Sequence, residues 1–340
     1  MIANFLEKKY RNLIDKAQEH GKSYEQNSED SQEEVDPDLP NEDLNQHKNW
    51  KLLNDEDCGL SISDRIVGGK NASLGQYPWI ARLGYAKKIL YPDMYDYSDA
   101  EYLDENKVLV FECGASLISD LYVVSAAHCV VGLPSSITLA RVRLGEHNDQ
   151  SGIDCEDDVC AEPVQDFDPV KIIPHPEYKD ELFKHDIALI KLDRKYNKNG
   201  WVYPICTISG DLIFKDYVGT YAEVAGWGFT DRDSEVLAHV LQTIQLPIVE
   251  NEQCNKAYKK TTTIGISQMC VGGVVGMDSC GGDSGGPLQK VDFIGDQPPR
   301  YYLIGIVSFG PKYCGTEKPA VYTRVANFLP WILDNIDPHF

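Results

Sequence analysis

The chain has few basic residues and no long apolar segment. Lys and Arg total 32 against 53 Asp and Glu, so the formal net charge of the 340 residues is −21. A charge of this sign argues against binding to nucleic acid and to anionic membrane surfaces, because both repel an acidic protein. No apolar run approaches the roughly 18 residues that a membrane-spanning helix needs, so we expect no such span.

Residues 1–57 contain no cysteine, and they carry seven basic and fifteen acidic residues. Their apolar stretch ends at Leu6, well short of the roughly 7 to 15 apolar residues found in a signal peptide. So polar a segment cannot bury enough apolar surface to offset the entropy lost on ordering. The composition therefore predicts a mostly disordered acidic leader over residues 1–65, ahead of a globular domain over residues 66–340.

All ten cysteines follow that segment, the first being Cys58. So many cysteines are typical of an oxidising compartment and indicate a secreted protein. We therefore expect that the natural N-terminus, with its signal peptide, is missing from this sequence. Cys155 and Cys160 would be poor zinc ligands, because no histidine lies nearby to complete a site.

From Ile66 onward, short apolar or alternating segments recur between turn residues. They include residues 77–85, 121–130, 137–145, 186–192, 221–228, 301–310 and 320–325. Many short strands separated by turn signals predict an all-β sandwich or barrel. Only the C-terminal end has the periodicity of a helix, with one apolar face made of Leu329, Ile332, Leu333 and Ile336.

Three short motifs carry the chemistry of the chain. They are Ser125-Ala126-Ala127-His128-Cys129, Asp186-Ile187-Ala188-Leu189 and Gly281-Gly282-Asp283-Ser284-Gly285-Gly286-Pro287. Acyl transfer to a serine requires a base that activates the hydroxyl and a third group that orients the base. His128, Asp186 and Ser284 supply these residue types. The glycines around Ser284 leave the backbone N–H groups of Gly282 and Ser284 available to stabilise an oxyanion.

With these motifs in this order, residues 66–340 resemble a chymotrypsin/trypsin-family serine protease. The resemblance also covers Ile66-Val67-Gly68-Gly69, Ser308-Phe309-Gly310 and the C-terminal helix. It implies an all-β fold of two six-stranded antiparallel barrels, followed by an α-helix, with the catalytic residues in the cleft between the barrels. It also implies that Ser284 is the nucleophile, that His128 is the general base and then acid, and that Asp186 fixes the imidazole tautomer.

The resemblance places Asp278 at the floor of the primary specificity pocket. A buried carboxylate there selects Lys or Arg before the scissile bond, because it otherwise lacks a partner. Ala320 stands where the family usually has Gly. The extra methyl group narrows the pocket, so we expect a weakened or skewed preference between Lys and Arg.

The neighbouring subsites also follow from the resemblance. Ser308 and Gly310 are expected to hold the substrate backbone as an added strand. Phe309 replaces the commoner Trp. Phe183, just upstream of Asp186, is expected to crowd the adjacent subsite and to favour a small residue there.

Arg65-Ile66 resembles the family's activation site, so the chain as written is expected to be an inactive zymogen. Cleavage by another protease would free the ammonium group of Ile66, which in the family inserts beside the acid before the nucleophile, here Asp283. The resemblance also implies four disulfides, Cys113–Cys129, Cys254–Cys270, Cys280–Cys314 and Cys58–Cys206, the last tethering the leader. Pairing Cys155 with Cys160 completes the set.

The sequence DCEDDVC after LGEHN resembles the arthropod clip-domain proteases, which act in haemolymph cascades for melanisation, Toll-type signalling or clotting. No cysteine precedes Cys58, so the cysteine-rich clip module is absent. Either it is missing from this sequence together with the signal peptide, or the protein is a relative without it. We expect a monomer that needs no cofactor and that meets a protein substrate such as a downstream zymogen, an upstream activating protease and a serpin-type inhibitor.

Two acidic loops and one sequon complete the expectations. Residues 146–168 hold nine acids. One interpretation is a structural calcium site whose ligands begin with Glu146, and the other is a solvated acidic loop. Residues 91–106 contain four Tyr and six acids. This insertion either attracts basic residues after the scissile bond or is a passive surface loop. Asn71 begins the only N-glycosylation sequon.

Two other functions compete with the regulatory zymogen. A digestive trypsin is disfavoured by the long tethered leader and the elaborated loops. A non-catalytic protease homologue that acts as a binding cofactor is disfavoured because His128, Asp186 and Ser284 are all present. Only Ala320 gives that second alternative any support.

Overall fold

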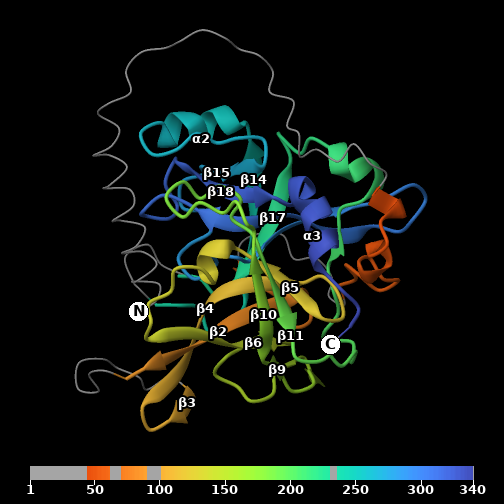
Figure 1. Cartoon of the computed structure of the whole chain (residues 1–340), viewed down its shortest axis with the longest axis vertical. Coiled ribbons are helices and arrows are strands. Elements are labelled where there is room, and N and C mark those ends of the chain that lie inside the picture. The colour runs from red at the N-terminus through yellow and green to blue at the C-terminus, as the bar shows by residue number, and fades with distance from the viewer. Residues whose placement is uncertain (1–43, 62–69, 90–100, 230–235, 340) are drawn as a thin grey trace.

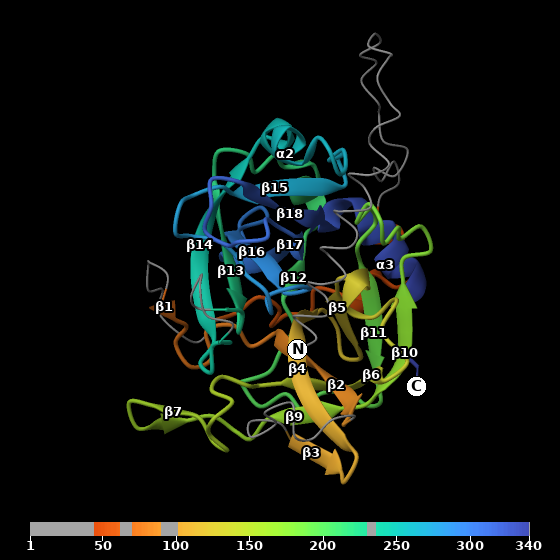
Figure 2. The same cartoon turned by 90° about the vertical axis from the view of Figure 1, so that its left-hand side faces the viewer.

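The computed structural model describes residues 44–61, 70–89, 101–229 and 236–339. Two β-barrels form the body of the molecule, with the strands of the second half of the chain above those of the first half in both views (Figure 1, Figure 2). No helix within the described ranges has the length and hydrophobicity required to cross a membrane.

The first barrel is formed by the N-terminal half of the chain. Its strands are β2 (Ile80–Lys88), β4 (Lys107–Leu117), β5 (Tyr122–Ser125), β6 (Ile137–Leu144), β9 (Gln165–Phe167), β10 (Pro169–Pro174) and β11 (Ala188–Leu192). They pair in the order β10-β11-β5-β4-β2-β6-β9. Because β9 leads directly into β10, the two ends of this sheet meet and the barrel is nearly closed. The short strand β3 (Glu101–Asp104) extends the edge of β4.

The second barrel closes completely. Its strands are β13 (Tyr221–Gly226), β14 (Gln242–Val249), β15 (Gln268–Gly272), β16 (Pro287–Asp292), β17 (Arg300–Phe309) and β18 (Pro319–Arg324). They pair antiparallel in the order β14-β13-β16-β17-β18-β15, and β15 pairs back with β14 to close the barrel. Two-residue strands β1 (Lys70–Asn71) and β12 (Cys206–Thr207) add to β14 and β17. The predicted all-β fold of two barrels is confirmed.

Short helices cover the ends of the barrels. The 3-10 turns that follow the docked N-terminal residues are η4 (Ala127–Cys129), η5 (Gly210–Phe214) and η6 (Val325–Phe328). The α-helices are α2 (Asn251–Tyr258) and α3 (Leu329–Asn335). The predicted apolar face of the C-terminal helix is confirmed, since Leu329, Ile332, Leu333 and Ile336 are each at most 1% exposed. A small hairpin of β7 (Cys155–Glu156) and β8 (Val159–Cys160) lies in the acidic 146–168 loop.

The two barrels are joined by a buried polar contact and by packing. Trp79 precedes β2, is fully buried, and donates from Nε1 to Oε1 of Gln289 on β16 over 2.7 Å. All ten cysteines form disulfides, and the five pairs coincide with the four that the resemblance implies and with the remaining pair that completes the set. They are Cys58–Cys206, Cys113–Cys129, Cys155–Cys160, Cys254–Cys270 and Cys280–Cys314.

Residues 44–61, here named the docked segment, belong to the part of the chain expected to be leader. They form the 3-10 turns η2 (Leu44–Gln46) and η3 (Trp50–Leu52), and the side chains of Leu44 and Leu53 are buried. The segment therefore packs on the barrels. The disorder expected for residues 1–43 and 62–65 concerns positions outside the described residues.

Asn49 connects the docked segment to the C-terminal helix. Its Nδ2 donates to the carbonyl oxygens of Leu333 over 2.9 Å and of Ile336 over 2.7 Å. These are carbonyl groups at the end of α3, which have no partner within the helix itself. Asn54 acts similarly elsewhere, since its Oδ1 accepts from the amide of Thr207 over 2.7 Å. The docked segment thus provides hydrogen-bond partners for backbone groups of α3 and of the second barrel.

We predict that Asn49→Ala lowers the free energy of unfolding by about 1 to 2 kcal/mol, because it removes two hydrogen bonds to helix-terminal carbonyls. Denaturant unfolding of the uncleaved chain measures this change. Lys51→Ala, an exposed substitution in the same segment, is the matched control and should change the stability by less than about 0.5 kcal/mol. Equal unfolding midpoints for the two variants would contradict the prediction.

Candidate active site

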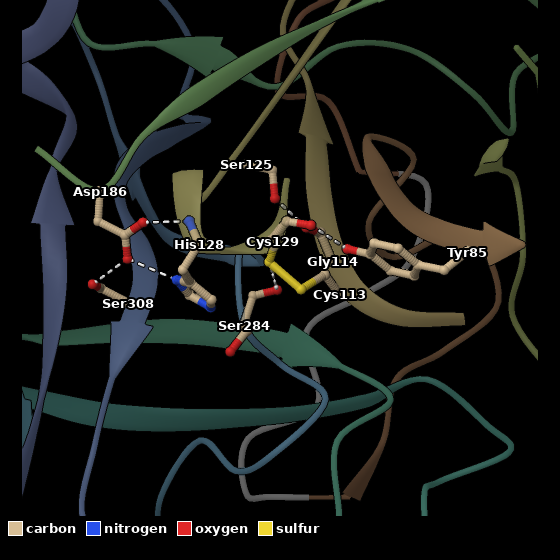
Figure 3. The surroundings of a disulfide bond; sticks show 9 residues. All are labelled: Tyr85, Cys113, Gly114, Ser125, His128, Cys129, Asp186, Ser284 and Ser308. Atoms are coloured by element: carbon tan, nitrogen blue, oxygen red, sulfur yellow. Dashed lines mark hydrogen bonds and ion pairs between the residues drawn. A yellow bond between two sulfur atoms is a disulfide. The ribbon is translucent and has the colours of Figure 1, made fainter. Parts of the chain in front are cut away.

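His128 lies in the 3-10 turn η4, directly after strand β5. The small side chains of Ala126 and Ala127 are fully buried, which allows the chain to turn tightly against the barrel. Cys129 ties the turn to β4 through its disulfide with Cys113, and Tyr85 donates from its hydroxyl to the carbonyl oxygen of Cys129 over 2.9 Å. The imidazole is thus fixed by the elements on both sides of it (Figure 3).

Asp186 lies just before β11, is fully buried, and faces His128 (Figure 3). Its Oδ2 lies 2.8 Å from Nδ1 of His128, and its Oδ1 accepts from the His128 amide over 2.9 Å. Ser308, at the end of β17, donates to Oδ2 over 2.6 Å. Burial alone would raise the pKa of Asp186, but His128 and these hydrogen bonds outweigh it and hold the pKa below its usual value.

The carboxylate also sets the tautomer of the imidazole. A carboxylate only accepts hydrogen bonds, so Nδ1 of His128 carries the proton and Nε2 carries the lone pair. Within the described ranges, Nε2 is buried and has no hydrogen-bond partner. The ring therefore offers an unused basic nitrogen beside the candidate nucleophile. The hydrogen bond between a catalytic base and its nucleophile commonly forms only when a substrate is bound.

Ser284 comes from the other barrel, in the loop between β15 and β16. The amide of Gly114 on β4 donates to the carbonyl oxygen of Ser284 over 2.8 Å, so the backbone of the serine is held against the first barrel. Gly285 has a φ of +78°, and a Cβ there would lie 2.2 Å from Oγ of Ser125. Only glycine fits, which explains its place directly after the serine.

Asp283 is half-buried, and its carboxylate lies between the barrels. Its Oδ1 accepts from the amide of Gly228 and its Oδ2 from the amide of Cys280, each over 2.8 Å. Burial raises the pKa of Asp283 to about 6, and the cause is that these two amides only partly offset the lost hydration. The expected cation, the ammonium of Ile66 after cleavage at Arg65, concerns two positions outside the described residues.

Asp278 is a second acid, and its carboxylate has few hydrogen-bond partners to replace the lost hydration. Its Oδ2 accepts from the amide of Gly315 over 3.3 Å, and its buried Oδ1 has no hydrogen-bond partner in the described part of the chain. Burial raises the pKa of Asp278 to about 7. Ala320 lies nearby on β18 and is buried. A Cβ built on Gly310 would lie 3.3 Å from the Ala320 methyl group, so these two positions face each other across a narrow gap.

Three aromatic rings form a wall beside the imidazole. The ring of Phe183 lies 6.1 Å from His128 and 5.2 Å from Phe309, measured between ring centroids. Tyr258, on α2, contacts the other side of Phe309 with centroids 5.3 Å apart. The sequence analysis did not find Tyr258, because nothing in its local pattern distinguishes it from a surface tyrosine. Only packing of α2 on the barrel brings it here.

The remaining predicted residues lie away from this cluster. Glu146 is buried, and its carboxylate lies 3.5 Å from a guanidinium nitrogen of Arg143, so calcium binding there stays a prediction. Asn71 is exposed on β1, and its Oδ1 accepts from Gln242 over 2.9 Å. In the 91–106 insertion, Glu101 pairs with Arg141 over 2.9 Å, and residues 91–100 lie outside the described ranges.

The site therefore joins an acid, an imidazole and a serine from two barrels at one cleft, in the arrangement of a hydrolase that uses a serine nucleophile. A family model described as Trypsin matches residues 66–332. The chain belongs to the trypsin family. It is a serine endopeptidase, and the matched segment contains every residue of the cluster formed by His128, Asp186 and Ser284.

Individual relatives agree with this assignment. The "CLIP domain-containing serine protease HP8" of Bombyx mori is 40% identical over 295 residues, which are 84% of this chain and 73% of that protein. "Phenoloxidase-activating factor 3" of Holotrichia diomphalia is 39% identical over 297 residues, 85% of this chain and 77% of that protein. A crystal structure of the Drosophila Grass clip serine protease of the Toll pathway matches 84% of this chain and 77% of its own at 35% identity, with a TM-score of 0.70.

The raised pKa of Asp278 predicts how the stability of this trypsin-family chain depends on pH. A carboxyl group with a raised pKa in the folded state contributes stability that is complete below its unfolded pKa of about 3.9 and is lost as the pH rises to the folded value. We therefore expect the melting temperature of the uncleaved wild type to fall relative to Asp278→Asn between about pH 4 and pH 7. Thermal unfolding over this range measures the difference.

Asp296→Asn, at an exposed turn, serves as the control and should follow the wild type at every pH. If the curve of Asp278→Asn also runs parallel to that of the wild type, Asp278 does not titrate as a buried acid and the prediction is wrong.

Proposed function

We propose that this chain is a secreted zymogen of a trypsin-like endopeptidase that cleaves after Lys or Arg and acts in an extracellular proteolytic cascade. The observation that carries the specificity is the buried carboxylate of Asp278, whose Oδ1 has no hydrogen-bond partner within the described ranges. A basic substrate side chain supplies the missing cation. Loss of hydration makes the Asp278 carboxylate unfavourable without a partner and raises its pKa. The same loss favours a Lys or Arg side chain, whose positive charge stabilises the carboxylate.

The chemistry follows from the tautomer of His128. Oγ of Ser284 attacks the scissile carbonyl carbon while Nε2 of His128 removes the hydroxyl proton. The resulting imidazolium faces Asp186, which stays ionised because its pKa is held low. The amides of Gly282 and Ser284 stabilise the oxyanion. His128 then returns the proton to the leaving amine, and water releases the acyl group by the same steps in reverse.

Substrate backbone would pair with the end of β17. Ser308 and Gly310 lie there, and Phe309 between them packs against Phe183 with the ring planes tilted by 37°, which supports this end of the strand. We propose that Phe183 limits the residue before the basic side chain to a small one, because its ring stands between the imidazole and Phe309. The proposed reaction and substrate binding use only side chains and amides of the chain. We therefore propose that the reaction needs no cofactor.

Activation is proposed to occur by cleavage after Arg65. The support lies in the half-buried Asp283, whose carboxylate accepts hydrogen bonds from two amides and whose pKa is raised to about 6 by loss of hydration. A buried carboxylate is stabilised strongly by a cation that reaches it. The new ammonium group of Ile66 is such a cation, and Asp283 is joined directly to Gly282 and Ser284, so its position affects the oxyanion amides.

The cascade role rests on the relatives and on the cysteines. Two relatives bear the names "Phenoloxidase-activating factor 3" and "Melanization protease 1", and a similar structure comes from a protease of the Toll pathway. The five disulfides support secretion, because such bonds persist in oxidising compartments. We propose that the chain acts as a monomer on a protein substrate, after an upstream protease has cut it, and that a serpin-type inhibitor stops it.

The first test measures turnover of matched Lys and Arg chromogenic peptides before and after cleavage at Arg65. We expect activity only after the cut, because the ammonium of Ile66 is absent before it. The uncleavable variant Arg65→Gln should stay inactive under the same treatment. Ser284→Ala, cut in the same way, should lose activity by at least about 10⁴-fold and so reports any activity that comes from the activating protease.

No turnover from a chain whose N-terminus is verified as Ile66 would contradict the proposed function and favour a binding homologue. Equal turnover by the cut wild type and cut Ser284→Ala would show that the activity is a contaminant. Activity toward apolar rather than basic peptides would contradict only the role of Asp278.

The second test concerns the methyl group of Ala320. We predict that Ala320→Gly raises kcat/KM for Arg peptides more than for Lys peptides, by about tenfold, because the guanidinium is the larger group and overpacking typically costs about 1 to 3 kcal/mol. The ratio of the two specificity constants is compared with that of the wild type. Ala326→Gly, another buried alanine outside the pocket, controls for a general loss of stability. An unchanged ratio would contradict the prediction.

A further inference from the structure

Two histidines meet beside the catalytic acid because of strand pairing. His175 follows β10 and His185 precedes β11, and these strands are antiparallel neighbours. The His175 amide donates to the carbonyl oxygen of Ile187 over 2.9 Å, which extends the ladder by one step. The two rings therefore lie on the same side of the strand ends and stack, with centroids 5.0 Å apart and planes 12° apart.

Glu177 completes a cluster with these two rings. One ligand atom from each of His175, Glu177 and His185 lies within 4.8 Å of the other two. Oε2 of Glu177 is 3.6 Å from Nε2 of His185. Two ligands bound to one tetrahedral zinc ion, at the usual bond lengths of about 2.0 to 2.1 Å, are about 3.3 Å apart. The contact between Glu177 and His185 is already close to that separation.

The backbone orients the rings of this cluster. Nδ1 of His185 lies 3.2 Å from the carbonyl oxygen of Glu177, and a carbonyl only accepts, so the proton is on Nδ1 and the lone pair of Nε2 faces the Glu177 carboxylate. A histidine that binds a metal usually donates its other ring N–H to a carbonyl or a carboxylate in this way. The Glu177 amide donates to Nδ1 of His175 over 3.2 Å, so the metal-free ring carries its proton on Nε2. Metal binding through His175 therefore requires either that Nδ1 exchange this hydrogen bond for the metal or that Nε2 release its proton.

The other side of the cluster is apolar and rigid. Phe328 contacts both imidazoles edge-on, with centroids 5.3 Å from His175 and 5.9 Å from His185, and Trp331 lies 5.1 Å from His175. Glu177 remains exposed, so the open side reaches solvent. Solvent can supply a water molecule as the fourth ligand. A second group, Cys113 with His128 and Cys129, is also close enough for a metal, but both sulfurs are in a disulfide and cannot bind as thiolates.

We propose that His175, Glu177 and His185 bind one divalent transition-metal ion, with zinc as the best match, and that the bound metal inhibits the peptidase. Two imidazoles and one carboxylate suit zinc better than calcium or magnesium, which prefer oxygen ligands. The binding part stands on the geometry alone. The inhibition part rests on the peptidase activity described above.

The coupling follows from the residue next to the ligand. His185 has a φ of +55°, and its carbonyl oxygen accepts from the amide of Ile187 over 2.8 Å. Asp186 is thus the central residue of a tight turn whose first residue would be a metal ligand. Rotation of His185 toward a metal moves that turn, and the Asp186 carboxylate must keep its 2.8 Å contact with Nδ1 of His128 and its 2.9 Å bond from the His128 amide to hold the imidazole in place.

The binding test uses cobalt(II), which replaces zinc and has visible absorption bands that report tetrahedral coordination. It is titrated into the uncleaved chain carrying Ser284→Ala, so no peptidase activity is involved. We expect one ion per chain and displacement of the cobalt by zinc. His175→Gln and Glu177→Gln should each weaken binding by at least about tenfold. His239→Gln, at an exposed histidine paired with Asp149, is the matched control and should bind like the parent.

The activity test compares each cleaved enzyme with and without zinc, so that any effect of a substitution on the metal-free rate cancels. Zinc should lower kcat of the wild type by at least about fivefold and have little effect on Glu177→Gln. Absence of one-to-one cobalt binding, or binding that survives both substitutions, would overturn the site. Inhibition that persists in Glu177→Gln would mean that zinc acts elsewhere, for example on the imidazole of His128, and would overturn the coupling.

If the cleaved chain hydrolyses no peptide at all, the proposed function fails while the cobalt titration still decides the site. Binding without any zinc effect on an active enzyme would leave the site in place and disprove the inhibition.

Discussion

The carboxylate of Asp186 is buried without contact with water, and the catalytic cleft depends on how it is satisfied. His128, from the first barrel, supplies two of its hydrogen-bond donors, and Ser308, from the second, supplies another. Thr323 on β18 holds its backbone by donating to the carbonyl oxygen over 2.8 Å. A buried charge that loses a partner costs several kcal/mol, so the barrels must close on Asp186 together. The same bonds that join the barrels orient the imidazole.

Much of this arrangement could be predicted from the sequence, because the motifs are short and each fixes its own local geometry. Gly285, for example, is required by a contact that any backbone of this shape creates. The barrels follow from many short alternating strands. The docked segment could not be predicted, because the partners of Asn49 lie at the far end of the chain, on α3. The stacking of His175 on His185 likewise depends on the register of β10 and β11, which composition does not reveal.

Two acids beside the cleft share one electrostatic condition. Asp278 and Asp283 are both half-buried, and loss of hydration raises the pKa of each because neither has a cation among its described hydrogen-bond partners. In the proposed mechanism one cation arrives with the substrate and the other with the new N-terminus. The folded chain thus holds two carboxylates that lack a cation, and a different cation stabilises each of them. The control of activation is therefore separate from the choice of substrate.

The docked segment has a consequence for how the enzyme meets its partners. It is attached by the Cys58–Cys206 bond and by the Asn49 contacts to α3, so in the proposed activation a cut at Arg65 would leave the docked segment on the barrels. Anything that binds residues ahead of Leu44 then stays within reach of the barrels. Covalent attachment to the barrels raises the effective concentration of such a partner near the protease. A weak partner of those residues would therefore behave as a nearly permanent neighbour of the protease, and proteolysis would remain confined to the place where that partner is fixed.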